Sequence, residues 1–399
     1  MMLATVAVSA SAVATGVDAP TATTLSTIVD ALPTNTRVYL ALLIATYALH
    51  AVFMNYTFGG MLWTAVAALR GRYSVEVSRD VSRDTPRDTL ATVVRDWMPS
   101  AVSAAVTAGI APLLFVQIVY QRSFYTANIL LFNRWMALLP ALIVAVFAMY
   151  VVKAHGAGGV SNGARSTTFF TRRSAKSAAA VLAALLIGFV GLAFIENHLL
   201  SLAPETWRDR YVEGSPALPA APVWIRLAMW MLGALPTFAA LAAWQLRCGA
   251  GNANEDDCAR SARPLALVAI VGAVGSLACG VAVWTTSHGG TRLLDDSLGK
   301  LAFGVLAIAL LVGGAAWIAI ALQRRLSTVA VLLTVAASFV AILSHAALRE
   351  GARLLALAGT SAAPREPSGL GGLAVFLVFL VLSAGAITWI VRAVARALR

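Results

Sequence analysis

The chain has 399 residues, of which 59% are hydrophobic and only 12% are charged, and its formal net charge is +12. An ordinary soluble domain carries about 25% charged residues, so this composition excludes a soluble globular architecture. The basic residues alternate between loops instead of forming one patch, which argues against nucleic acid as a partner. The partner that this composition predicts is a lipid bilayer.

Residues 1–36 precede the first long apolar run and contain no Lys or Arg. Their apolar start, Met1 to Gly16, lacks the basic region that opens a cleaved signal peptide. We therefore predict a retained, mobile segment over 1–36 and a single transmembrane helical domain over 37–399.

Nine apolar runs separated by polar breaks follow this segment. Their lengths match the roughly 20 residues that an α-helix needs to cross a ~30 Å hydrocarbon layer. The sequence thus predicts an all-α polytopic transmembrane bundle with about nine spans. The predicted spans are 38–69, 97–120, 135–152, 177–203, 223–246, 264–286, 301–323, 326–348 and 371–391.

The loop charges predict the orientation of these spans. With nine crossings, 19 of the 30 Lys and Arg residues fall on one face of the membrane. By the positive-inside rule that face is cytoplasmic, which puts the N-terminus outside and the C-terminus inside. We expect a multi-pass protein of the plasma membrane, in the inner membrane of a bacterium.

The first run contains His50 and, further along, the pair Gly59-Gly60. This pattern resembles the opening helix of two groups of bacterial membrane proteins, the copper-resistance D type and the membrane urate oxidase type. The resemblance is confined to residues 49–60, and Tyr56 and Thr57 stand where those families tend to place Trp. It implies a His-ligated haem or copper near His50, with small residues that let a flat ring or another helix approach closely.

Aromatic and polar residues lie between the second and third runs, on the predicted outer face. Gln117, Tyr120 and Tyr125 belong to this segment. Amphipathic aromatic side chains favour the membrane interface, so anchoring is one interpretation. A pocket for a quinone headgroup is the other.

Two ionisable residues, Glu196 and His198, lie in the outer half of the fourth run. Polar side chains in spans are costly and usually face the bundle interior, where they serve a pathway, a cofactor or a hydrogen bond between helices. As a catalytic residue, Glu196 could take a proton from a quinol or relay protons outward. The alternative is an ion pair with Arg226 or another outer arginine.

The predicted outer face also carries a loop over 207–214 and His288, which lies at the outer interface. The loop is long enough for a short surface helix that would dock a periplasmic redox partner. The alternative interpretation is a solvated connector. His288 is an alternative cofactor ligand.

His345 in the eighth run lies about 12 Å outward of the bilayer centre, at the same depth as His198. One His from each of two facing helices is the usual way in which a membrane bundle holds haem b, so this pair is the predicted metal site. Arg349 and Arg353 follow at spacings of four and eight, on nearly one helix face. They would bind haem propionates, or else extend to the interface as membrane arginines commonly do.

Three functions therefore remain open. The first is a b-type cytochrome or quinol-reacting electron-transfer subunit that passes electrons toward a partner on the outer face. The second is a transporter or copper permease in which the same histidines line a path. The third is a cofactor-free structural subunit that binds other membrane subunits. The sequence itself favours the first through His198 and His345.

Overall fold

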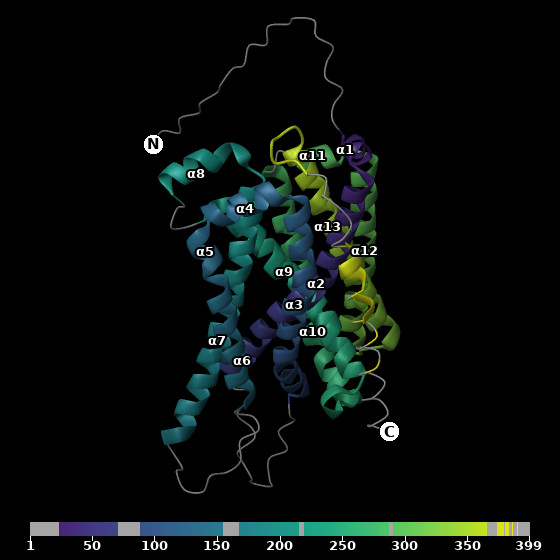
Figure 1. Ribbon diagram of the computed structural model, residues 1–399. Helices are drawn as coiled ribbons and strands as arrows, with labels where there is room; N and C mark the ends of the chain where they lie inside the picture. Colours follow the sequence, from purple (N-terminus) through teal and green to yellow (C-terminus); the bar gives the residue numbers. More distant parts are fainter. Residues whose placement is uncertain are drawn as a thin grey trace, which may run out of the picture.

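The computed structural model describes residues 24–70, 88–154, 167–214, 219–286 and 290–364, most of 373–382, and residues 385 and 389. For 154, 167–174, 286, 290 and 291 it describes the backbone alone. The described residues form helices and no β-strand, and eight of the helices are long and apolar enough to cross a membrane. The predicted all-α polytopic bundle is thus confirmed (Figure 1).

The long helices alternate in direction between the two ends of the bundle (Figure 1). In chain order they are α2 (Thr34–Leu69), α3 (Thr89–Val119), α6 (Leu138–Ala154, preceded by the short α5, Phe132–Met136), α7 (Thr167–Ser201), α9 (Ala221–Arg247), α10 (Glu255–Thr286), α12 (Ser297–Gln323) and α13 (Thr328–Leu357).

Four short helices gather at one end, which we call the capped end: α1 (Leu25–Ala31), α4 (Gln121–Leu130), α8 (Trp207–Glu213) and α11 (Gly290–Leu293) (Figure 1). The opposite end, the loop end, carries the connection over 248–254 and the turn at 324–327. The capped end is the one that the charge distribution predicts to face outward.

Several predicted boundaries differ from the observed ones. α3, α7 and α10 begin at Thr89, Thr167 and Glu255, before the predicted starts at 97, 177 and 264. α13 continues past the predicted end at 348 to Leu357, because Glu350 and Arg353 pair with each other inside the bundle. The third predicted span, 135–152, contains a turn at Ala137, where α5 ends and α6 begins. Of the ninth predicted span, 371–391, an apolar helix over Leu373–Leu382 is described, and most of the remaining residues lie outside the described part of the chain.

The predicted mobile segment over 1–36 is partly folded. Residues 1–23 lie outside the described residues, but α1 follows them and docks on the bundle. Leu25 is 7% exposed and packs against Gly351 of α13, where a Cβ atom would lie 2.9 Å from the Leu25 side chain. Ser26 donates to Asp296 Oδ2 from its backbone N–H at 2.9 Å and from its hydroxyl at 2.7 Å. These contacts order the end of the segment that was expected to be mobile.

Asp296 also caps α12, since its Oδ1 accepts from the backbone N–H of Leu298 at 2.8 Å. Burial opposes ionisation of this carboxyl, but the hydrogen bonds from Ser26 and from the α12 N-terminus outweigh it and hold its pKa below the usual value. A carboxyl whose pKa is depressed in the folded state stabilises the fold above its unfolded pKa, about 4. That stabilisation is lost as the pH falls through the folded-state pKa.

We therefore expect Asp296→Asn to lower the free energy of unfolding by roughly 1–2 kcal/mol at pH 7, since a charge-assisted hydrogen bond is replaced by a neutral one. The loss should shrink as the pH is lowered, because the wild-type carboxyl itself becomes protonated as the pH falls through its depressed folded-state pKa. Thermal unfolding in detergent from pH 7 to 3 measures both. The neighbouring exposed Asp295→Asn is the control, and an equal, pH-independent effect of both variants would contradict the assignment.

Small residues bring α9 and α10 into close contact. Pro236 has no N–H to donate to the Leu232 carbonyl one turn earlier, and Gly272 of α10 packs against that carbonyl: a Cβ atom on Gly272 would lie 2.6 Å from the Leu232 oxygen. One turn along, the Ser276 hydroxyl donates to the Met229 carbonyl at 2.9 Å. The proline and the glycine together allow the two backbones to approach.

Gly272→Ala should push α10 away from α9 and lower the free energy of unfolding by about 1–3 kcal/mol, the usual cost of overpacking. Gly314→Ala on α12 is the matched control, because nothing lies within 4 Å of a Cβ atom there. Thermal unfolding of the two variants in one detergent measures the difference. Equal stability of both would contradict this account of the α9–α10 contact.

A buried polar cluster joins α2 to α9 near the middle of the bundle. Trp230 Nε1 donates to Asn55 Oδ1 at 3.1 Å, and Asn55 Nδ2 donates to the Thr237 hydroxyl at 3.4 Å. Asn55 and Thr237 are 6% and 4% exposed. Because each polar atom has its partner inside the protein, the cluster fixes the register of the two helices.

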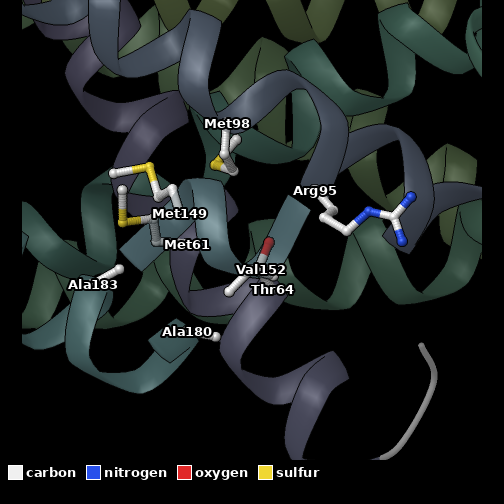
Figure 2. A pocket seen from close by; sticks show the side chains of 8 residues that line it. All are labelled: Met61, Thr64, Arg95, Met98, Met149, Val152, Ala180 and Ala183. Atoms are coloured by element: carbon white, nitrogen blue, oxygen red, sulfur yellow. The ribbon is translucent and has the colours of Figure 1, made fainter. Parts of the chain in front are cut away.

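Between this cluster and the loop end, four helices surround a small cavity of about 10 Å³ (Figure 2). The cavity is lined by side chains of α2, α3, α6 and α7: Met61, Thr64, Arg95, Met98, Met149, Val152, Ala180 and Ala183.

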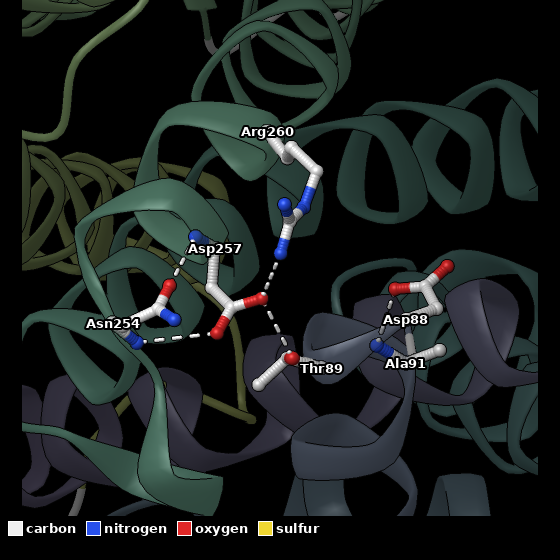
Figure 3. Close-up of polar contacts among 6 residues, drawn as sticks. All are labelled: Asp88, Thr89, Ala91, Asn254, Asp257 and Arg260. Atoms are coloured by element: carbon white, nitrogen blue, oxygen red, sulfur yellow. Dashed lines mark hydrogen bonds and ion pairs between the residues drawn. The ribbon is translucent and has the colours of Figure 1, made fainter. Parts of the chain in front are cut away.

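At the loop end itself, one carboxylate joins α10 to α3 (Figure 3). Asp257 accepts from the Thr89 hydroxyl at 2.9 Å and from Arg260 at 2.6 Å, and it exchanges backbone-to-side-chain hydrogen bonds with Asn254. These contacts cap α10 and fix it against the start of α3.

Candidate functional site

The capped end of α13 carries the arginines that the sequence singled out. The guanidinium of Arg349 lies 4.5 Å from the centre of the Tyr47 ring on α2. The guanidinium of Arg353, one turn further, lies 4.6 Å from the centre of the Tyr120 ring at the end of α3. Cation–π contacts of this kind orient a guanidinium without neutralising its charge. Arg353 is buried inside the bundle, whereas Arg349 is half-buried against α2.

Arg353 is the most connected residue of this region. Its Nη1 lies 3.1 Å from Glu350 Oε1, and its Nη2 lies 2.9 Å from Nδ1 of His198 on α7. Arg353 and Glu350 are 4% and 5% exposed. The Nε–H of Arg353 is buried with no acceptor among the described residues, and a buried donor without an acceptor costs about 1–3 kcal/mol. An oxygen atom of a bound ligand could accept a hydrogen bond from this N–H.

The contact with Arg353 fixes the proton on His198. A guanidinium can only donate hydrogen bonds, so Nδ1 of His198 is the acceptor. In a neutral imidazole the proton then sits on Nε2. His198 in this state presents an N–H, and not a lone pair, to any group that approaches its Nε2 atom.

His50 has the opposite arrangement. Its Nδ1 lies 2.9 Å from the carbonyl oxygen of Ala105 on α3. A carbonyl only accepts, so Nδ1 carries the proton and Nε2 has a free lone pair. Gly109 makes room for the ring, since a Cβ atom there would lie 2.9 Å from His50 Cε1. A ring held by an Nδ1–H bond to a backbone carbonyl is the usual state of a metal-ligating histidine.

Two histidines remain among the predicted cofactor ligands, His345 and His288. His345 lies on α13 one turn before Arg349, and its side chain is exposed. His345 lies within electrostatic range of His198, and so do the arginines 226, 349 and 353. Arg349 also lies within electrostatic range of His50. The structure thus brings His198, His345 and His50 to the region of the two arginines. His288 lies outside the described residues.

Glu196 lies on the other side of α7 from His198, because two residues along an α-helix turn the side chain by about 200°. It forms an ion pair with Arg134 of α5, so its partner is another arginine of the predicted outer face and not Arg226, one of the two alternatives that the sequence left open. Its Oε2 atom is buried without a hydrogen-bond partner in the described part of the chain. Glu196 is therefore a protonatable group separate from the arginine cluster.

The predicted quinone pocket is divided. The Tyr125 hydroxyl donates to Gln117 Oε1 at 3.3 Å, and Tyr125 is 44% exposed at the bundle surface. Tyr120 is 2% exposed and belongs instead to the Arg353 contacts. Gln117 and Tyr125 thus form one corner of α3 and α4, and Tyr120 forms part of the interior.

The Gly59-Gly60 pair serves helix packing. A Cβ atom on Gly59 would lie 2.4 Å from Phe238 of α9, and one on Gly60 would lie 2.4 Å from Met98 of α3. Small residues here could admit either a flat ring or another helix. The contacts that the structure describes at both glycines are with neighbouring helices. Within the described residues no group of three His, Cys, Asp or Glu side chains could hold a metal ion.

Sequence reasoning missed two members of the cluster, Tyr47 and Glu350. Tyr47 precedes His50 by three residues and so shares its helix face, which was the available signal. Glu350 was hidden because the eighth span was predicted to end at 348, before it.

Comparison of the chain with protein-family models and with curated proteins finds no match. The function therefore has to be argued from the site itself.

The buried pair of Glu350 and Arg353 gives a prediction of its own. Arg353→Met should lower the free energy of unfolding by about 3–5 kcal/mol, because it leaves a carboxylate buried without its partner. Adding Glu350→Gln to that variant should recover much of the loss. Thermal unfolding of the two single variants and the double variant provides the cycle.

Arg208→Met on the exposed face of α8 is the control and should change the free energy of unfolding by less than about 0.5 kcal/mol. If Arg353→Met is equally unstable with and without Glu350→Gln, the two residues do not form the coupled pair described above.

Proposed function

We propose that the protein is a b-type cytochrome, an electron-transfer subunit of a plasma-membrane complex that passes electrons toward a partner on the outer face. The observation that carries the proposal is the state of His50. Its Nδ1–H is held by the Ala105 carbonyl, so the lone pair of the neutral ring lies on Nε2, and Arg349 lies within electrostatic range of the ring.

Iron coordination needs the imidazole lone pair, and this requirement orders the candidate ligands. His50 meets it without rearrangement. His198 would have to lose its hydrogen bond from Arg353 and move its proton from Nε2 to Nδ1. We therefore propose His50 and His345 as the haem ligands, and we propose that His198 positions Arg353.

The acidic edge of the haem fits the two arginines of α13. Arg349 and Arg353 lie one and two turns beyond His345 toward the capped end. The Arg349 guanidinium contacts an aromatic ring, and the Nε–H of Arg353 is a buried donor without an acceptor among the described residues. Guanidinium groups bind carboxylates through short, charge-assisted hydrogen bonds. Haem propionates directed at the capped end would meet both.

Haem b, when bound, supplies a one-electron redox couple. A quinol would give up two electrons and two protons in two such steps, so its oxidation needs proton acceptors in this chain. Glu196, whose Oε2 atom is buried without a partner in the described residues, is our proposed acceptor. It would take one proton at each step and pass the first outward before it receives the second. Gln117 and Tyr125 offer an amide and a hydroxyl to the quinol headgroup at the corner of α3 and α4.

The capped end also offers a surface for the redox partner. α8 is a short helix within 207–214, as the length of that loop allows, and its Tyr211 and Val212 are 80% and 76% exposed. If the capped end faces outward, as the loop charges predict, this helix would meet a periplasmic protein.

The absorbance spectrum of the full-length protein, purified in detergent from a haem-competent host, tests the proposal. We expect a Soret band and a reduced-minus-oxidised α band. His50→Ala should lose both bands. His198→Gln, the matched control at a second histidine of the same region, should keep them. Arg349→Gln should retain haem and lower its midpoint potential by tens of millivolts, because a cation near the haem favours the reduced, more negative form.

A colourless wild-type protein that elutes as a folded species would overturn the cytochrome and favour the cofactor-free structural subunit. Retention of both bands in His50→Ala together with their loss in His198→Gln would overturn our choice of ligand.

A further inference from the structure

The cavity near the loop end has a layered lining. Each of the four surrounding helices contributes two residues three positions apart: 61 and 64 on α2, 95 and 98 on α3, 149 and 152 on α6, and 180 and 183 on α7. Because adjacent spans run in opposite directions, Met61, Met98 and Met149 fall in one layer. Thr64, Arg95 and Val152 fall in the layer nearer the loop end.

We call the layer of Met61, Met98 and Met149 the upper layer and the layer nearer the loop end the lower layer. The upper layer brings together three thioether side chains from three different helices. Met61, Met98 and Met149 are 2%, 2% and 5% exposed. Figure 2 shows their side chains turned toward the same cavity, with the Arg95 side chain directed away from them. The cavity volume of about 10 Å³ admits roughly one water-sized guest. A single ion is a guest of that size.

The lower layer supplies a second, independent observation. The Thr64 hydroxyl is buried without a hydrogen-bond partner in the described part of the chain, and Thr64 is 5% exposed. A buried oxygen that lines a cavity and has no partner is a further donor atom for a guest. The guanidinium of Arg95 lies 2.9 Å from Asp96 Oδ1. That carboxylate offsets the positive charge which would otherwise repel a cation.

The chemistry of the lining selects the guest. Thioethers are neutral, soft ligands, and soft sulfur ligands prefer Cu(I) among the biological metals. Hard divalent cations such as Mg²⁺ and Ca²⁺ require several oxygen ligands, which the layer of methionines lacks. Low charge also matters, since an apolar interior penalises a monovalent ion less than a divalent one.

We propose that Met61, Met98 and Met149 form a binding site for a soft monovalent metal ion, Cu(I), with Thr64 beside it. The site is separate from the histidine–arginine cluster, because Met61 lies on the loop-end side of the Asn55–Thr237 cluster and His50 lies on the other. No electron is transferred on binding, since the ion enters and remains as Cu(I).

Methionine also fills irregular gaps in apolar cores, so the experiment must separate binding from packing. Ag(I) serves as a redox-inert probe of the same charge and softness, and Cu(I) is used without oxygen. The full-length protein in detergent is titrated with each ion in competition with a chelator of known affinity. X-ray absorption at the metal edge then identifies the ligand atoms.

We expect one ion per chain, coordinated by sulfur. Met61→Leu, Met98→Leu and Met149→Leu should each weaken binding at least tenfold, and the triple variant should abolish it. Leucine nearly conserves the volume of methionine, so the fold should survive these changes. Met231→Leu, in the same apolar core but outside the cavity lining, should bind as the wild type does.

Equal affinity and stoichiometry in the wild type and in a folded triple variant would overturn the site. So would a wild-type protein that fails to compete with the chelator for Ag(I), or a bound ion whose ligands are nitrogen or oxygen. Zn²⁺ should not displace Ag(I), and displacement would contradict the selectivity argued from the thioethers.

Discussion

The hydrogen-bonded pairing of Arg353 is the constraint on which the capped end of the bundle depends. A buried guanidinium is tolerated where its charge is paired and most of its donors have partners. Arg353 has such partners in Glu350, His198 and the Tyr120 ring, and its Nε–H is left without an acceptor among the described residues. These partners come from α13, from α7 and from the end of α3. Because α7 and α13 each pack on α2 and α9, the side chains of His198 and Arg353 meet between those helices. One arginine thereby fixes the relative positions of three elements and the protonation state of a histidine.

His50, which is half-buried, and His198, which is buried, show how a backbone or side-chain partner decides what an imidazole can do. Ala105 presents a carbonyl to His50, whereas Arg353 presents an N–H to His198. The first leaves a lone pair on Nε2 and the second leaves a proton there. Depth in the membrane, which made His198 and His345 the natural pair in the sequence, carries no information on this point.

The all-α membrane bundle could be predicted from hydrophobic run length alone, because the bilayer imposes that length on any spanning helix. The ends of the individual helices were harder to predict from the sequence. The end of α13 was misplaced since Glu350 and Arg353 look like the polar end of a span until their mutual pairing is known. The docking of α1 depends on Ser26 and Asp296, which are far apart in the sequence. The grouping of Arg349 and Arg353 on one face could be predicted, but their aromatic partners Tyr47 and Tyr120 could not, because those contacts join separate helices.

The hydrogen-bonded group of Asn55, Trp230 and Thr237 has a consequence for how the bundle can move. It lies between His50 on the capped side and Met61 on the loop side, and it ties α2 to α9 at that level. Sliding or separation of these two helices there would have to break both buried hydrogen bonds. At this level α2 and α9 are therefore held as one unit, and a rearrangement of the bundle would have to take place around them.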